Sequence, residues 1–162
     1  MSVAFTREED AEAAAAFLPE RPVSPHPNLV TAAGLDALES ALAAARQDHA
    51  AAQVAGDAGA DRSAIARAAR DLRYYGARRA TAQLVRPDPA SPKVQFGGTV
   101  TIVRADGRRQ TFRIVGEDEA DAARGSVSHV SPLARAVLGR EVGDEATLAG
   151  SPIDIVAVDN GG

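Results

Sequence analysis

The sequence lacks cysteine and tryptophan altogether, and its aromatic residues are limited to two tyrosines and four phenylalanines. Without cysteine the chain cannot form a disulfide scaffold, a thiolate zinc site or a cysteine nucleophile. The three histidines, His26, His49 and His129, lie far apart in the sequence, so a cluster of histidine metal ligands is not expected. An alanine-rich chain with few aromatics buries little apolar area per residue, which predicts thin helical packing over part of the fold.

Long hydrophobic runs are absent as well, so no segment is expected to span a membrane. The N-terminus is acidic and has no apolar core of a secretion signal. The expected location is therefore the cytoplasm, without a membrane partner. A length of 162 residues suits one average domain or two small ones, and it is enough to bury a core without disulfides.

The net charge of −4 is spread unevenly along the chain. Residues 29–61 are acidic, whereas residues 62–86 contain seven arginines and one aspartate. Two explanations of this basic stripe are open. The arginines could pair with an acidic neighbouring helix, which we favour, or they could contact nucleic acid. Nucleic-acid binding would need aromatic platforms near the arginines, and Tyr74 and Tyr75 are the candidates.

Residues 1–28 combine an acidic run, an alanine run and four prolines. Proline at this density favours extended backbone. We interpret residues 1–28 as an acidic, proline-rich N-terminal arm with at most a short helix, and a disordered tail is the alternative.

Residues 29–86 have the pattern of an antiparallel helical hairpin with a coiled-coil seam. Thr31 is suited to cap the first helix. Apolar residues then recur at spacings of three and four from Leu35 to Ala52. Gly56 and Gly59 mark the turn to a second, basic helix.

Residues 93–159 have the pattern of a small antiparallel β-domain with one short helix, so that the whole chain is predicted to be α+β. The helix covers residues 131–139, because Ser131 can cap it, Pro132 suits its first position and a glycine ends it. The expected strands are 94–96, 99–103, 110–115, 146–148 and 153–158.

Several motifs in this order resemble the GreA/GreB transcript-cleavage factors of bacterial RNA polymerase. They are VQFGGTVT at 94–101, FRIVGEDEAD at 112–121, SPLARAVLG at 131–139 and VGD at 142–144. The resemblance covers about residues 29–159, and the first 28 residues lie outside it.

The resemblance implies an FKBP-like C-terminal domain that docks at the rim of the polymerase secondary channel, and a coiled-coil arm that enters the channel. In that family, acidic residues at the arm tip help to hold a second magnesium ion at the polymerase active site. The implied partner is RNA polymerase, with nucleic acid contacted only indirectly. The chain is expected to be a monomer that is not itself an enzyme and has no cofactor or metal of its own.

The tip departs from the family pattern, which reads approximately Gly-Asp-Leu-Lys-Glu-Asn-Ala-Glu-Tyr. Asp57 matches the tip aspartate, but Ala60 stands where the glutamate should be, and Asp61 lies one position further on. Both aspartates also have structural roles available, Asp57 in an Asx-turn and Asp61 as a helix cap. Each arm is shorter by about seven residues, or roughly 10 Å of helix.

We therefore expect a regulator that binds RNA polymerase at the secondary channel and stimulates cleavage weakly or not at all. The alternative is a true cleavage factor that supplies Asp57 and Asp61 to the polymerase magnesium. A peptidyl-prolyl isomerase is disfavoured, because its site needs an aromatic-lined pocket and the β-domain has only Phe96 and Phe112.

Two further groups of residues are candidate sites. The start of the short helix is the expected polymerase-binding edge, with Ser131, Pro132, Leu133 and Arg135. An acidic cluster could hold a metal or could cap local structure, which we favour; it comprises Glu117, Asp118, Glu119 and Asp121.

Overall fold

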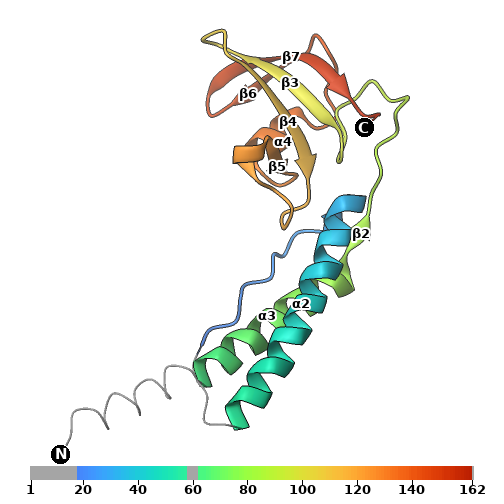
Figure 1. The fold of residues 1–162 in the computed structure, drawn as a ribbon. Helices are drawn as coiled ribbons and strands as arrows, with labels where there is room; N and C mark the ends of the chain where they lie inside the picture. The colour runs from blue at the N-terminus through green and yellow to red at the C-terminus, as the bar shows by residue number, and fades with distance from the viewer. Residues whose placement is uncertain (1–17, 58–61, 162) are drawn as a thin grey trace, which may run out of the picture. The chain divides into compact units, whose positions relative to one another are not determined.

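The computed structural model describes residues 18–57 and 62–161 (Figure 1). The chain divides into two compact units. One, which we call the arm unit, contains, among the described residues, 18–25, 38–57 and 62–81. The other, the β unit, contains His26–Ala37 together with the residues from Ala82 onward.

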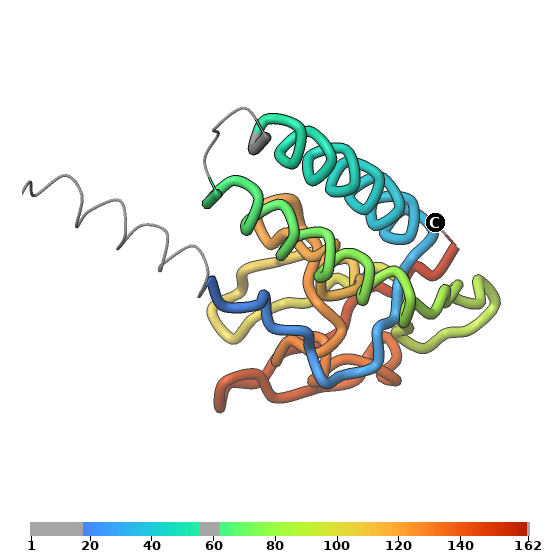
Figure 2. Tube along the Cα trace, turned by 90° about the horizontal axis from the view of Figure 1, so that it is seen from below, coloured from blue at the N-terminus to red at the C-terminus, as the bar shows by residue number. Residues whose placement is uncertain are grey.

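The arm unit is built on two helices, α2 (Ala32–Asp57) and α3 (Arg62–Thr81), which run side by side (Figure 2). This confirms the predicted helical hairpin. On α2 the buried apolar residues of the seam are Leu38, Leu42 and Ala45, which repeat at helical spacing. All of α3 is described, and its one fully buried residue is Arg78. The apolar side chains of α3, such as Ile65 and Leu72, are half-buried, so the second side of the seam contributes no fully buried apolar residue.

The β unit contains a five-stranded sheet in the order β5-β4-β3-β7-β6. Its pairs are antiparallel except β4 with β5, which run parallel, so the sheet is mixed rather than wholly antiparallel. The α+β class is confirmed. The strands are β3 (Thr99–Arg104), β4 (Arg109–Val115), β5 (Ser126–Ser128), β6 (Glu145–Leu148) and β7 (Ser151–Asp159).

The short helix α4 (Pro132–Val137) closes the core of the β unit. Leu133, Ala134 and Val137 are buried in one apolar cluster with strand residues such as Ile102 and Ile114. Each fully buried aliphatic side chain of this kind contributes about 1.5–3 kcal/mol. The β unit therefore has a larger buried apolar core than the arm unit.

The segment 94–96, expected as a strand, does not join the sheet. The N–H of Val94 donates to the carbonyl of Arg140 at 2.8 Å, and the N–H of Gly139 donates to the carbonyl of Val94 at 2.9 Å. Val94 and Phe96 are buried. The segment thus pairs with the end of α4 and the residues that follow it. Its apolar residues are explained by their burial in the core, because the segment is not a strand of the five-stranded sheet.

Three short strands were not expected: β5 in the sheet, and two strands of two residues each. β1 (Leu29–Val30) and β2 (Gln83–Leu84) pair in parallel, just before α2 and just after α3. Leu84, expected near the end of the second helix, lies instead in β2 and is 44% exposed. The helix ends earlier because the backbone N–H of Gln83 donates to the carbonyl of Asn28 at 2.9 Å.

A large-to-small change in the seam tests how much the arm depends on its few buried leucines. Leu38→Ala is expected to cost about 2–4 kcal/mol, because Leu38 is 3% exposed and its truncation leaves a cavity. Denaturant unfolding followed by far-UV circular dichroism measures it. The matched control is Val54→Ala in the same helix, where the side chain is 73% exposed. Equal unfolding free energies for the two variants would show that the seam is wrongly placed.

Candidate functional site

The N-terminal end of α4 is a rigid corner of the β unit. The Ser131 hydroxyl accepts a hydrogen bond from the N–H of Ala134 at 3.2 Å and caps the helix, and Pro132 occupies its first turn. Both features lock the backbone in place. The cap and the proline were predicted from the sequence.

The four predicted polymerase-binding residues take different positions in this corner. Pro132 and Arg135 are exposed, and Ser131 is half-buried. Leu133 is only 8% exposed and belongs to the core. Its side chain therefore supports the corner from inside and does not form part of its surface. The spacing of Leu133 and Val137, four residues apart, could have indicated this inward face.

The two tip aspartates stay predictions. Asp57 is the last residue of α2, and nothing beyond its place in the helix is described. Asp61 lies outside the described residues. Within the described parts of the chain, no group of three or more acidic or histidine side chains is arranged to hold a metal ion. No helix there combines the length and the apolar character needed to cross a membrane.

The acidic loop after β4 caps local structure. The Glu119 carboxylate accepts a hydrogen bond from the Thr31 hydroxyl at 2.6 Å, and the same hydroxyl oxygen accepts from the N–H of Gly34 at 3.0 Å. Thr31 thus caps α2, as predicted, and its hydroxyl also binds the loop through Glu119. Asp121 caps the short 3₁₀ helix η1 (Ala122–Arg124) by accepting from the N–H of Ala123. These contacts favour the capping interpretation over a metal site.

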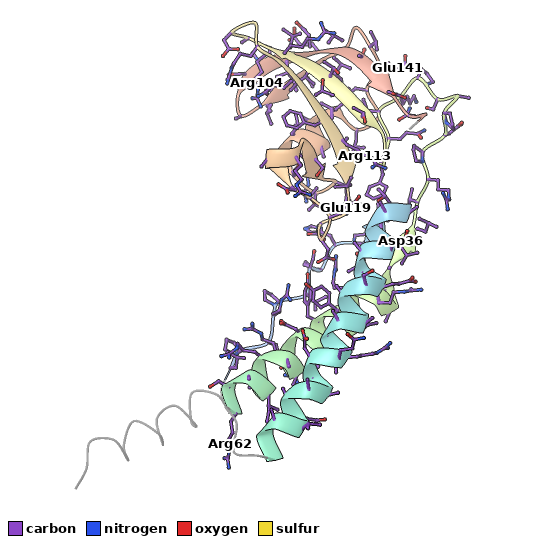
Figure 3. The ribbon with its side chains drawn as sticks, viewed as in Figure 1. Asp36, Arg62, Arg104, Arg113, Glu119 and Glu141 are labelled. Carbon is purple, nitrogen blue, oxygen red and sulfur yellow. The ribbon has the colours of Figure 1, made fainter. Side chains whose placement is uncertain are left out.

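Two glycines permit this close approach within the β unit. A β-carbon on Gly34 would lie 2.6 Å from the Glu119 carboxylate, and one on Gly116 would lie 2.4 Å from the carbonyl oxygen of Leu29. Figure 3 shows Glu119 beside the start of α2. The first turn of α2 is therefore fixed to the 116–121 loop, and we call this contact the Thr31–Glu119 joint.

The aromatic side chains of the β unit serve the core. Phe96 is buried and meets the ring of His129 edge-on at 5.5 Å between centroids. Phe112 packs on the same apolar cluster. Because both phenylalanines contribute to packing, they do not supply the open aromatic pocket that a prolyl isomerase would need.

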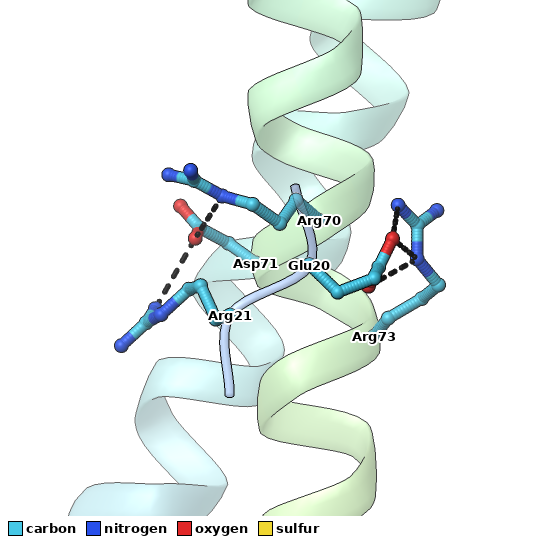
Figure 4. Close-up of polar contacts among 5 residues, drawn as sticks. All are labelled: Glu20, Arg21, Arg70, Asp71 and Arg73. Carbon is cyan, nitrogen blue, oxygen red and sulfur yellow. Dashed lines mark hydrogen bonds and ion pairs between the residues drawn. The ribbon is translucent and has the colours of Figure 1, made fainter. Parts of the chain in front are cut away.

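The basic stripe on α3 is paired from two sides, and Figure 4 shows the pairs that it forms with the segment before α2. Arg79 pairs across the hairpin with Glu39 at 3.0 Å, as expected for an acidic first helix. Unexpectedly, Arg73 donates to both carboxylate oxygens of Glu20 at 2.9 Å, from the segment that precedes α2. These hydrogen bonds, and the charge of Arg73, hold the pKa of Glu20 below its ordinary value of 4.5.

The next residue, Arg21, contributes a positive charge that contacts an acidic side chain of α3. Its guanidinium pairs with Asp71 on α3 at 3.1 Å and lies 3.9 Å from the ring centroid of Tyr74, a cation–π geometry. The candidate aromatic platform of the basic stripe is therefore covered by the chain's own Arg21. Glu20 and Arg21, predicted as part of an extended arm, thus contact α3. Sequence patterns carried no signal for such a distant pairing.

The hydroxyl of Thr31 can be removed to test the Thr31–Glu119 joint. Thr31→Val loses the helix cap and leaves the Glu119 carboxylate without this donor, so we expect a loss of about 1–3 kcal/mol in unfolding free energy. Thr31→Ser keeps the hydroxyl and is the control. Denaturant unfolding measures both, and a valine variant as stable as the serine variant would contradict the role of the joint.

Comparison with known proteins finds a family match within the β unit. Residues 88–157 match the family model described as "Transcription elongation factor, GreA/GreB, C-term". A transcription elongation factor GreA from Hyphomonas neptunium is 57% identical over 58 residues, which are 35% of this chain and 37% of the relative. Another GreA, from Desulfovibrio desulfuricans, is 42% identical over 94 residues, 57% of each chain.

The chain thus spans between 37% and 57% of the length of these two relatives. Among solved structures, GreA factor homolog 1 of Thermus thermophilus is similar with 21% identity and a TM-score of 0.38, covering 82% of this chain and 99% of that one.

Proposed function

Because the chain carries at residues 88–157 the C-terminal domain of the GreA/GreB family of transcription elongation factors, we propose that it binds RNA polymerase and regulates elongation at the secondary channel. The observation that carries this proposal is the family match over the β unit, together with the rigid corner at α4. The chain acts as a regulatory factor and contributes no active site of its own.

The corner at α4 suits a docking role for a physical reason. A capped helix start with proline in its first turn keeps its shape when a partner binds, so little ordering entropy is lost on association. Pro132 and Arg135 are exposed there, one apolar and one able to donate several hydrogen bonds. Ser131 and the buried Leu133 hold these two side chains in position.

Charge reversal at the corner tests the docking surface. The double variant Pro132→Glu/Arg135→Glu is expected to bind RNA polymerase at least about tenfold more weakly, since central interface residues carry most of the binding free energy. Affinity is measured by biolayer interferometry on purified core polymerase. Arg109→Glu, an exposed arginine on β4, is the matched control. If the double variant folds and binds as the wild type does, polymerase docking does not use this corner.

The length of the arm bears on what it can do inside a channel. The part of α2 within the arm unit, Leu38 to Asp57, and the 20 residues of α3 each extend roughly 30 Å. A magnesium ion shared with a polymerase needs hard oxygen ligands at the right distance. A short arm with Ala60 in place of the tip glutamate provides fewer such ligands. We therefore propose weak or absent stimulation of transcript cleavage, with Asp57 and Asp61 as the tip residues.

A transcript-cleavage assay on stalled elongation complexes tests this part. We expect little or no stimulation, no further change with Asp57→Ala, and competition with a long-armed Gre factor at equal concentration, because both would occupy one channel. Strong cleavage that disappears in Asp57→Ala would establish the alternative, a true cleavage factor that uses Asp57 and Asp61. Asp36→Ala, which removes an exposed aspartate near the start of α2, is the control.

A further inference from the structure

The segment before α2 carries a group of contacts that the proposed function does not use. Residues 18–25, which we call the strap, lie across α3 within the arm unit (Figure 4). Glu20 binds Arg73, and Arg21 binds Asp71 and covers the ring of Tyr74. Adjacent strap residues of opposite charge thus meet α3 residues of the complementary charge. This alternation fixes the strap in one register, because a shift by one residue would bring like charges together.

The two ion pairs that join the strap to α3 lie where water and salt can weaken them. The side chains of the Arg73–Glu20 pair are 57% and 59% exposed, and those of the Arg21–Asp71 pair are 34% and 39% exposed. Exposed ion pairs are screened by salt. The strap residue Val23 is 48% exposed, so apolar burial adds little at that position. A segment attached in this way can leave α3 without unfolding the helices.

We propose that the strap is an autoinhibitory clasp on the arm, closed over α3 in the free protein and displaced when the arm binds its partner. The proposal rests on the proposed function, in which the arm enters a polymerase channel. A channel encloses an arm from all sides, so a segment lying on α3 takes the space and the contacts that the channel wall would use. Binding must then open the clasp. The apparent affinity equals the intrinsic affinity multiplied by the fraction of molecules in the open state.

A charge-neutral double variant separates the clasp from simple charge effects. Glu20→Ala/Arg21→Ala removes one negative and one positive charge, so the net charge of the chain is unchanged. Hydrogen exchange of the full chain should show faster exchange in residues 18–25 and unchanged exchange along α3. The same variant should bind core RNA polymerase about three- to tenfold more tightly, as expected when a partly populated competent state becomes dominant.

Glu39→Ala is the matched control, because it removes a carboxylate that is paired with the α3 residue Arg79 and does not touch the strap. It should leave both the exchange of residues 18–25 and the polymerase affinity close to wild type. An equal gain in affinity for Glu39→Ala would show that unmasked positive charge, and not strap release, is responsible, and this would overturn the proposal.

A locked form gives the opposite test, and the absence of cysteine from the chain makes it specific. Glu20→Cys/Arg73→Cys joined by a short bismaleimide should bind polymerase at least about tenfold more weakly than the same variant without the linker. Equal affinities of the linked and unlinked forms would refute autoinhibition. So would weaker binding by Glu20→Ala/Arg21→Ala, which would make the strap a supporting part of the arm.

The failures of the two proposals can be told apart. If residues 18–25 exchange at wild-type rates in the double variant, the ion pairs do not hold the strap and the clasp is refuted whatever the polymerase result. If wild type shows no binding to polymerase at all, the proposed function fails, and the autoinhibitory role fails with it, although the exchange data still decide whether the clasp exists.

Discussion

Scarcity of buried apolar surface governs how the two-helix arm is held together. On α2 the buried seam consists of Leu38, Leu42 and Ala45, whereas α3 presents Arg78 as its one fully buried residue. Alanine contributes little area when it is buried. The Arg79–Glu39 ion pair adds a charged contact across the hairpin, and the strap adds further charged contacts to α3. Each such ion pair contributes only about 0–1 kcal/mol and is screened by salt. The charged contacts of the arm can therefore be broken without a large cost in free energy.

The β unit follows the opposite principle. Its strands and α4 share one apolar cluster, in which Ile102, Ile114 and Val137 are completely buried. The first turn of α2 also belongs to this unit, where the Thr31–Glu119 joint and two close-packed glycines fix it. The family match at residues 88–157 falls within this unit.

Local signals predicted most of the regular elements. Helical spacing gave α2 and α3, a serine, a proline and a glycine gave α4, and strand patterns gave β3, β4, β6 and β7. The sequence did not predict β1, β2 and β5, because strands of two or three residues are too short to show a period. The segment at Val94 looked like a strand because burial and strand pairing select the same residues.

The site was less predictable than the fold, because its key contacts join residues far apart in the chain. The Thr31–Glu119 hydrogen bond and the pairing of Glu20 with Arg73 have no periodic signature. The arginine stripe was visible from the sequence, and its pairing with the acidic first helix was expected. Its second partner, Glu20, lies in a segment whose sequence indicated only extended, proline-rich backbone. Leu133 shows a different limit, since the motif that carries the family resemblance mixes core and surface positions.

A cryo-electron microscopy reconstruction of a stalled bacterial elongation complex saturated with this protein tests the central claim most directly. We predict that the β unit lies at the rim of the secondary channel, with Pro132 and Arg135 facing the polymerase. We also predict that α2 and α3 lie inside the channel and that the end of the hairpin stops short of the catalytic magnesium. Density for the β unit elsewhere on the polymerase, or Asp57 coordinated to that magnesium, would contradict the account.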